Sequence, residues 1–448
     1  MDTATARLAA RVRETRWQSL TPEVQRASLS VVFDALPAMV AGAGEEPARI
    51  ARSYARRFGG EPMCTVIGGG FRSAPTTAAY LNGIAGHVLD YEPMWHPATH
   101  PTSPVLPVTL ALAEWQGRNG RDILTALVAG FEVQTRLLLA MRGPPDGLHP
   151  PGVVGVMGAA AAAGWLLGFD ERTLCMALGI AGSRAGSLLA NAGTMTKSSH
   201  CGNAARMGLE AALLVAEGST AHEDILGALN GYGQVFLGAD RDSVDPAADY
   251  GRPFRIHDPG IGIKKYPSQY GTQRAVDAAL AIVRDHAPAA DDIASVLVSG
   301  PPMAYVDRPR PDSGLAGKFS FQYVTAVALL DGAVRIGSFS DDRRWAADVE
   351  ALLPRIRYQA RPDIPANFDG MWIETVVTLR DGRELRAECR RPTGIWGVPL
   401  TDAERDFKAR DCLSRALPAG AVEEVLGALR CLDQATVWQV RALLALLR

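Results

Sequence analysis

The stretch "VVGVMGAAAAAGWLLG", residues 153–168, decides the fold class, because nearly every side chain in it is small or apolar. Glycine and alanine let a neighbouring helix approach closely, so this composition is typical of a helix in a protein interior. The run is too short for a membrane span, and its flanks are not those of one. It therefore predicts a buried helix inside an α-helical domain.

Segments on both sides extend the helical pattern. "GRDILTALVAGFEVQTRLLLAM" (120–141) has apolar residues at helical spacing on one broad face. "FDERTLCMALGIAG" (169–182) has Asp170 as a candidate N-cap, and "GNAARMGLEAALLVAEG" (202–218) ends on a glycine that suits a helix stop. We therefore expect residues 1 to about 240 to form helix after helix.

The pattern changes near residue 250, where prolines and glycines become frequent. "TQRAVDAALAIVRDHA" (272–287) predicts a helix, and "IASVLVSG" (293–300) predicts a strand. "WIETVVTLRDGRELRAEC" (372–389) predicts a β-hairpin around Asp381-Gly382, a pair favoured in type I′ turns. This part of the chain therefore mixes helix and sheet.

The predicted fold class is mainly α, with a large all-helical domain and a smaller α+β domain. Residues 1–264 form the helical domain, residues 265–395 form the α+β domain, and residues 396–448 return to the helical one. Thr401 and Glu404 have capping-box spacing at the start of that last segment.

Composition and charge exclude several classes of function. The chain has 448 residues, of which 47% are hydrophobic and 21% charged, and its net charge is −2. That charge gives no electrostatic basis for binding nucleic acid or an anionic membrane. The N-terminus lacks the apolar core of a signal peptide, and Glu132, Gln134 and Arg136 interrupt the longest apolar run. The six cysteines are scattered, which is typical of reduced thiols, so we expect a cytoplasmic protein.

The stretch "DYEPMWHPATHPTSP" (90–104) carries two histidines four residues apart. That spacing suits a zinc site on a helix, but Pro97 and Pro101 push His96 and His100 toward extended geometry. The stretch therefore predicts a stiff, extended loop that carries two imidazoles. Two exposed loop histidines without a function are the alternative at this point.

The stretch "GTMTKSSHCG" (193–202) places Lys197, His200 and Cys201 in a predicted loop, before a helix that begins around Asn203. A helix N-terminus attracts anions, and the lysine would add a positive charge. A cysteine beside a histidine suggests a thiol nucleophile, but it is equally typical of a small packed residue.

Two further short stretches carry candidate groups. In "GLHPPG" (147–152), His149 again precedes proline and so lies in a stiff, non-helical setting. In "IKKYPS" (263–268), Lys264 and Lys265 lie between the two predicted domains. Taken alone, each of these residues is more often structural or solvent-exposed than functional.

Motifs for nucleotide, flavin or iron–sulfur binding are absent, as is the GxSxG elbow of hydrolases. The "GGG" at 68–70 has no lysine after it and is not a phosphate loop. No cysteine or carboxylate set has recognisable zinc spacing, so we expect no catalytic metal. Histidines, an aspartate and lysines in one pocket would suit a small polycarboxylate, because ammonium groups neutralise carboxylates while imidazoles move protons.

Four stretches together resemble the MmgE/PrpD family in order and spacing: "GHVLDYEPMWHPATHP", "GLHPPGVVGVMGAAAAAG", "GTMTKSSHCGNAARMGLEAALL" and "IKKYPS". The resemblance covers nearly the whole chain. It implies a large helical domain with an α+β lid, a homodimer, and no metal or organic cofactor. It also implies a lyase of the decarboxylase or dehydratase type on a small di- or tricarboxylate, and the "WHPATHP" run is most similar to the decarboxylase branch.

The resemblance also implies roles for individual residues. The lysines and histidines would hold carboxylates, and His100 or His149 would move the proton, while His96 would support the loop. The implied catalytic residues are Asp90, His100, His149, Lys197 and Lys264. Besides these, we expect Met94, His96 and His200 to be substrate-binding residues.

The chain departs from the family pattern at several positions. Met94 stands where an active-site threonine is expected, Glu92-Pro93 replaces an acidic pair, and Gln269 and Gln273 replace other residues. The resemblance to the family therefore does not identify the substrate of this chain. An epimerase of the iminodisuccinate type is the alternative within catalysis, and a non-catalytic carboxylate-binding protein is the alternative outside it.

Overall fold

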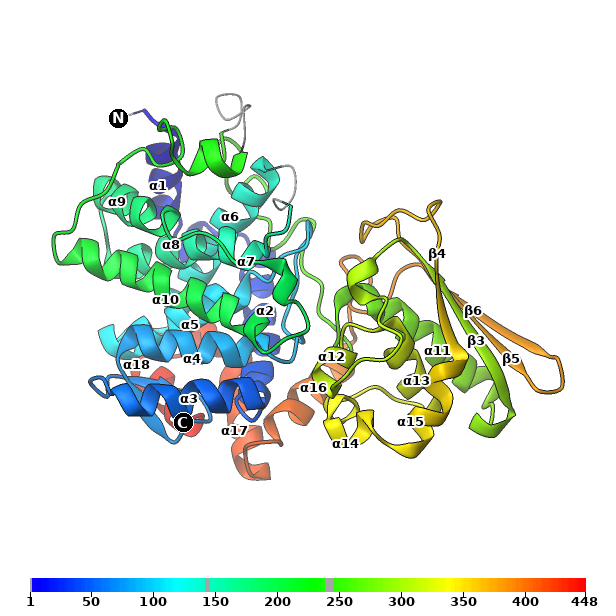
Figure 1. Ribbon diagram of the computed structural model, residues 1–448. Helices are drawn as coiled ribbons and strands as arrows, with labels where there is room; N and C mark the ends of the chain where they lie inside the picture. The colour runs from blue at the N-terminus through cyan, green and yellow to red at the C-terminus, as the bar shows by residue number, and fades with distance from the viewer. Residues whose placement is uncertain (1, 142–145, 238–244) are drawn as a thin grey trace.

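The computed structural model describes residues 2–141, 146–237 and 245–448. Figure 1 shows two parts: a helical body, which holds both chain ends, and a smaller part built on a sheet. The chain is mainly α, as the sequence predicts.

The body is formed by helices from the first half of the chain. Its helices are α1 (Ala4–Glu14), α2 (Pro22–Gly42), α3 (Glu46–Phe58), α4 (Pro75–His87), α5 (Thr102–Gln116), α6 (Gly120–Ala140), α7 (Pro150–Val153), α8 (Gly155–Leu167), α9 (Glu171–Gly182) and α10 (Thr196–Ala216).

Within residues 153–168, the buried helix α8 packs against α5, α6, α9 and α10. Close approach depends on the absence of a side chain at Gly158. A Cβ there would lie 2.4 Å from Gln134 Cγ and 2.5 Å from the Gly130 carbonyl oxygen, both on α6. The prediction of a tightly packed interior helix is confirmed.

The prediction of an unbroken series of helices is wrong at one place. Strands β1 (Cys64–Val66) and β2 (Phe71–Ser73) form a short antiparallel pair between α3 and α4. The "GGG" is the turn of this pair, because Gly68 and Gly70 adopt positive φ angles of 61° and 70°.

Helices α2 and α6 are long and apolar enough to cross a membrane, contrary to the expectation that no segment reaches that length. Within their most apolar windows, 72% of the residues of α2 and 94% of those of α6 are buried inside the protein. Their apolar side chains therefore belong to the core of the body.

The smaller part holds a four-stranded sheet in the order β4-β3-β5-β6, in which only β3 and β4 run parallel. Helices α11 and α13 pack beside it (Figure 1). Its elements are α11 (Gln273–His286), β3 (Ile293–Gly300), α12 (Gly314–Gly317), α13 (Phe321–Asp331), α14 (Asp341–Arg344), α15 (Ala347–Leu352), β4 (Ile356–Ala360), β5 (Ile373–Leu379) and β6 (Glu384–Cys389).

The predicted hairpin is confirmed as β5 and β6, but its turn is not type I′. Of the two turn residues, Gly382 has a positive φ of 90° and Asp381 does not. The Gly382 N–H donates to the Leu379 carbonyl, which closes a three-residue loop ending in a left-handed glycine.

The C-terminal segment forms α16 (Asp402–Leu413), α17 (Ala419–Arg430) and α18 (Val437–Leu446), with the predicted Thr401–Glu404 capping box. One buried apolar cluster draws on residues 6–256 and 409–447, and a second draws on residues 266–395 together with Met94. We call the part of the chain that surrounds the second cluster the lid. Its bounds, 265–395, are those predicted from the sequence.

A buried ion pair joins the tail to the body beneath the lid junction. Lys408 on α16 lies 2.8 Å from the Asp34 carboxylate on α2. Its ammonium also donates to the carbonyls of Tyr91, at 2.8 Å, and Lys264, at 2.9 Å. One lysine thus fixes two backbone segments that carry candidate site residues.

Asp34→Ala should lower the free energy of unfolding by about 3–5 kcal/mol, because it leaves the Lys408 charge buried and uncompensated. Chemical denaturation measures the change. Glu23→Ala on the same helix is the control: its pair with Arg26 is largely exposed, so we expect a much smaller loss. Equal losses of unfolding free energy in the two variants would show that the buried pair stabilises the protein no more than an exposed pair does.

Candidate active site

The segment between α4 and α5 carries much of the candidate site. Asp90 lies just after α4 with a positive φ of 51°, a conformation that aspartate tolerates better than most residues. Trp95 and Thr99 exchange backbone hydrogen bonds of 3.0 and 3.1 Å, so the "HPATH" stretch is a closed turn and not the predicted extended run. This turn directs His96 and His100 to different surroundings.

The predicted start of α10 is also wrong. The helix begins at Thr196, so Lys197, His200 and Cys201 lie in its first turns and not in a preceding loop. The N-cap position is Met195, whose side chain accepts no hydrogen bond, so the sequence lacks the usual N-cap signal there.

Two glycines bring the start of α10 against α4. A Cβ on Gly83 of α4 would lie 2.8 Å from the Gly202 Cα of α10, so only glycine permits this approach. The contact places the Lys197 ammonium 2.9 Å from His87 Nε2 at the end of α4.

A cavity of about 160 Å³ lies between the body and the lid. It collects residues from seven separate stretches of the chain, and both predicted lysines lie in it. Its lining residues are Asp90, Met94, Ala98, His100, Leu148, His149, Pro150, Leu189, Ala192, Lys197, Lys264, Gln269, Tyr270, Tyr305, Phe319 and Phe368.

Asp90 is the centre of charge in this cavity. Its carboxylate lies 2.5 Å from the Lys264 ammonium, 3.5 Å from that of Lys197 and 3.7 Å from His100 Nε2. Burial opposes ionisation, but the two ammonium groups outweigh it and hold the pKa of Asp90 well below its usual range. Burial also lowers the pKa of Lys264.

Glu92 lies behind the cavity and contacts two imidazoles. Its Oε1 accepts from the Ser103 hydroxyl at 3.2 Å, contacts His87 Nδ1, and lies 2.9 Å from His100 Nδ1. The contact to His100 is close but poorly aligned for a hydrogen bond, so it acts mainly through charge.

The carboxylate of Glu92 fixes the tautomers of both rings. Burial opposes its ionisation, yet His87 and His100 hold the pKa of Glu92 well below its usual range. An ionised carboxylate only accepts, so Nδ1 carries the hydrogen and the lone pair of each neutral ring lies on Nε2. His87 then accepts from Lys197, and His100 presents Nε2 toward Asp90.

Burial keeps all four site imidazoles neutral near pH 7. It lowers the pKa of His87 to about 3 and that of His200 to about 4, with Lys197 acting in the same direction. Burial also lowers the pKa of His100, and it takes that of His149 well below its usual range.

His149 and His200 form a pair at the side of the cavity. Their Nδ1 atoms are 3.1 Å apart, so one ring donates to the other. His200 contacts His149 and does not line the cavity itself. Burial raises the pKa of the Cys201 thiol well above its usual range, which disfavours the thiol-nucleophile interpretation.

His96 and Met94, the other two predicted binding residues, lie in different places. His96 Nε2 lies 2.9 Å from the Asp369 carboxylate of the lid, and its ring is near Trp396. It does not line the cavity, so it joins the turn to the lid. Met94 does line the cavity.

His87 was not predicted to be a site residue, and Glu92 was noted only as a departure from the family pattern. Lys318 was not predicted either, although it is fully buried and donates to the Leu89 carbonyl, next to Asp90, at 3.0 Å. Burial lowers the pKa of Lys318 to about 8. His87 lies in the stretch "GHVLDYEPMWHPATHP", which resembles the family. That position was the one indication in the sequence that His87 belongs to the site.

Metal ligation is a second chemical possibility for the cluster. Ligand atoms of His87, Asp90, Glu92 and His100 lie within 4.8 Å of one another. Lys197, however, occupies the Nε2 lone pair of His87, and ammonium groups contact both oxygens of Asp90. The donor set is thus already bound to cations of the protein and fits a metal poorly.

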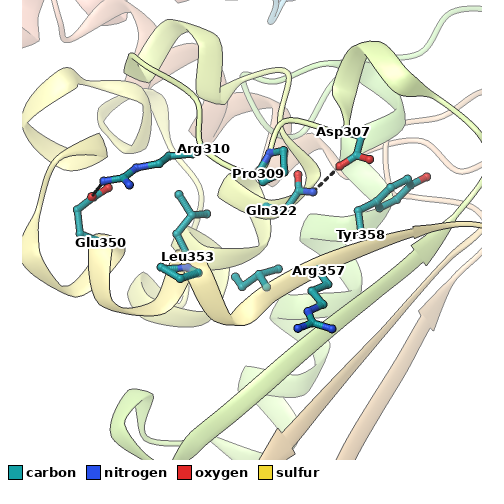
Figure 2. A pocket seen from close by; sticks show the side chains of 10 residues that line it. Asp307, Pro309, Arg310, Gln322, Glu350, Leu353, Arg357 and Tyr358 are labelled. Carbon is teal, nitrogen blue, oxygen red and sulfur yellow. Dashed lines mark hydrogen bonds and ion pairs between the residues drawn. The ribbon is translucent and has the colours of Figure 1, made fainter.

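A larger hollow of about 630 Å³ lies in the lid (Figure 2). Four of its polar side chains are engaged with one another: Arg310 pairs with Glu350 at 2.6 Å, and Gln322 donates to Asp307 at 2.6 Å. Among its lining residues there is no histidine, lysine or cysteine. The smaller cavity is therefore the better candidate for acid–base chemistry.

Glu92→Gln should lower turnover about tenfold or more, because the two imidazoles lose the carboxylate that orients them. It should also move the pH limb set by His100 to lower pH, since Glu92 stabilises the charged ring and its removal lowers that pKa further. A pH–rate profile measures both effects. Glu114→Gln, which changes a largely buried carboxylate outside the cavity, is the control and should leave the limb in place.

Fold and site together define a class of protein in which a helical body and a lid enclose a buried acid–base cavity. The family model for the MmgE/PrpD N-terminal domain matches residues 6–244, and that for the MmgE/PrpD C-terminal domain matches residues 266–434. The chain belongs to the MmgE/PrpD family.

Several curated relatives carry an activity in their names. The chain is 34% identical to the cis-aconitate decarboxylase of Mus musculus over 92% of its own length and 87% of the relative's. It is 35% identical to that of Homo sapiens over 92% and 88%. It is 26% identical to the cis-aconitate decarboxylase of Aspergillus terreus over 83% and 81%. These likenesses support a lyase of the MmgE/PrpD type.

Proposed function

We propose that this protein is a cofactor-independent lyase that acts on a small di- or tricarboxylate, by proton transfer at a carbon next to a carboxylate. The observation that carries the proposal is the cavity in which Asp90 lies between two ammonium groups, with two neutral imidazoles beside it. Ammonium groups attract carboxylates, and a neutral imidazole accepts a proton. The decarboxylases among the relatives favour a decarboxylase or dehydratase type.

The two lysines are the groups that would hold the substrate. A lysine ammonium has three N–H donors. Lys197 directs two toward His87 and Asp90, and Lys264 directs two to the carboxylate and the carbonyl of Asp90. Each therefore keeps one donor for a substrate carboxylate.

His100 is the group placed to move a proton. In a dehydration its Nε2 takes the proton from the carbon next to a carboxylate and then gives it to the departing hydroxyl, which leaves as water while a C=C bond forms. In a decarboxylation the bond to the carboxylate breaks, CO₂ leaves, and the electron pair stays on the carbon skeleton. His100 Nε2, which has first taken up a proton from solvent, then delivers it to that carbon in place of the carboxylate.

Incubation with a panel of carboxylates, followed by mass spectrometry, tests the proposal. The panel should include cis-aconitate, and the expected result is a product lighter by CO₂ or by water. The control is a His100→Gln/His149→Gln double variant, which should form no product. Activity that is lost to a chelator and restored by zinc would overturn the cofactor-independent part.

The epimerase alternative rests on the two imidazoles that line the cavity. The ring centroids of His100 and His149 are 6.0 Å apart, so two groups could flank one carbon and exchange its proton on opposite faces. A product of unchanged mass and inverted configuration would identify this reaction. Binding without any conversion would identify the non-catalytic alternative.

We also propose a homodimer in the cytoplasm. All six cysteines are free thiols, in keeping with a reducing compartment. Leu188 and Leu229, with 62% and 74% of their surface exposed, are apolar side chains that a second copy could cover.

A further inference from the structure

The cavity has a charged side and an apolar side. Asp90, Lys197, Lys264 and the two histidines form the charged side. Met94, Leu148, Leu189, Phe319 and Phe368 form most of the apolar side. Apolar walls favour a ligand that places an apolar group against them.

Met94 is held in this wall by its backbone. Its N–H donates to the Gly262 carbonyl, and the Gly262 N–H donates to the Met94 carbonyl, each at 2.8 Å. The pairing holds Met94 close to the segment that carries Lys264. A thioether is at best a weak acceptor and donates nothing, so Met94 itself offers a carboxylate no strong hydrogen bond.

Gln269, a neutral polar residue on the lid side of the cavity, is already engaged, whereas the Tyr270 hydroxyl has no hydrogen-bond partner among the described residues. Its side-chain carbonyl accepts from the N–H groups of Gly271 and Thr272 at 2.6 and 3.2 Å. Its amide nitrogen donates to the Tyr305 hydroxyl at 2.6 Å. The amide of Gln269 therefore stabilises the wall and has its main hydrogen-bonding groups already occupied.

The charges of the site allow few carboxylates. Lys197 and Lys264 are balanced by the carboxylates of Asp90 and Glu92, and each lysine has one donor left for a ligand. Among the described residues that line the cavity there is no arginine and no third lysine. A third substrate carboxylate would be buried without a cationic partner, which is costly.

We propose that the substrate is a small dicarboxylate with a short alkyl substituent, and that Met94 selects the alkyl group over a third carboxylate. The proposal rests on the proposed function, since it assumes that this cavity binds the substrate. The two carboxylates bind Lys197 and Lys264. The alkyl group packs against Met94, Phe319 and Phe368.

The test uses one carbon skeleton with four substituents: maleate, methylmaleate, ethylmaleate and cis-aconitate, which is carboxymethylmaleate. Isothermal titration calorimetry on the wild-type protein gives each affinity without requiring turnover. We expect affinity to rise about fourfold for each added CH₂ group from maleate to ethylmaleate. We expect cis-aconitate to bind about tenfold or more weakly than ethylmaleate, because its third carboxylate is unpaired.

Met94→Thr probes the wall directly. It should reduce the advantage of ethylmaleate over cis-aconitate several-fold, because it replaces the thioether by a hydroxyl that can bond a carboxylate. Met63→Thr, at a methionine outside the cavity, should leave that ratio unchanged.

The outcomes separate this inference from the proposed function. Tighter binding of cis-aconitate than of ethylmaleate, or no binding of the whole series, overturns the inference, even where cis-aconitate is converted. The expected order of affinities without any conversion supports the inference and contradicts the lyase.

Discussion

His100→Gln should lower turnover by about a hundredfold or more, the usual size of a general acid–base contribution. The ring lies in the cavity with Nε2 near Asp90, and glutamine cannot exchange a proton from that position. His96→Gln should change turnover only a few-fold, because His96 contacts Asp369 at the edge of the lid. Steady-state kinetics on the two variants decide the matter. An essential His96 with a dispensable His100 would refute this assignment.

The same role for His100 predicts where one limb of the pH–rate profile lies. Burial lowers the pKa of His100, so its limb in the pH–rate profile should lie below the ordinary value of 6.5. If the ring acts as a base, activity falls as the pH drops through that limb. If it acts as an acid, activity falls as the pH rises through it. In His100→Gln the limb should be absent in either case.

Lys197→Met should lower kcat/KM by about a hundredfold or more, because it removes an ammonium group from a buried charge cluster. The variant loses a donor to the substrate, and it also loses one of the two cations that keep Asp90 ionised. The side chain is buried in α10, so circular dichroism must show that the helical content is retained.

Lys265→Met is the matched control. Lys265 neighbours Lys264 but pairs with Glu404 at 3.0 Å, and both side chains are about one-third exposed. Such pairs contribute less than about 1 kcal/mol, so kcat/KM should change little. Equal losses in Lys197→Met and Lys265→Met would indicate a general effect of charge and would contradict a specific role for Lys197.

Much of the fold could be predicted because its signals are local. The Asp170 cap and the capping box at Thr401 reflect contacts within one turn, and the small and apolar residues of 153–168 form one uninterrupted run that marks a buried helix. The start of α10 could not be predicted, since Met195 precedes it without a capping side chain.

The site could be predicted only in part. Asp90, His100, His149, Lys197 and Lys264 were named from motifs, and the structure brings all five to one cavity, while their roles stay predictions. His87 and Glu92 were not recognised as a pair, because their contact depends on how the chain turns at Asp90. Contacts of this kind depend on tertiary packing, so they produce no motif of fixed spacing in the sequence.

Solvent deuterium incorporation tests the central claim, that this cavity transfers a proton at a carbon next to a carboxylate. The wild-type protein would be incubated in D₂O with ethylmaleate and, separately, with cis-aconitate. Mass spectrometry and proton NMR then locate the deuterium. With the wild type, the account predicts deuterium on the carbon that receives the proton, which is the carbon that loses CO₂ in a decarboxylation and a carbon next to a carboxylate in the other reactions. It predicts very little deuterium with His100→Gln. Deuterium uptake that is unchanged in His100→Gln, or ligand bound without uptake by the wild type, would contradict it.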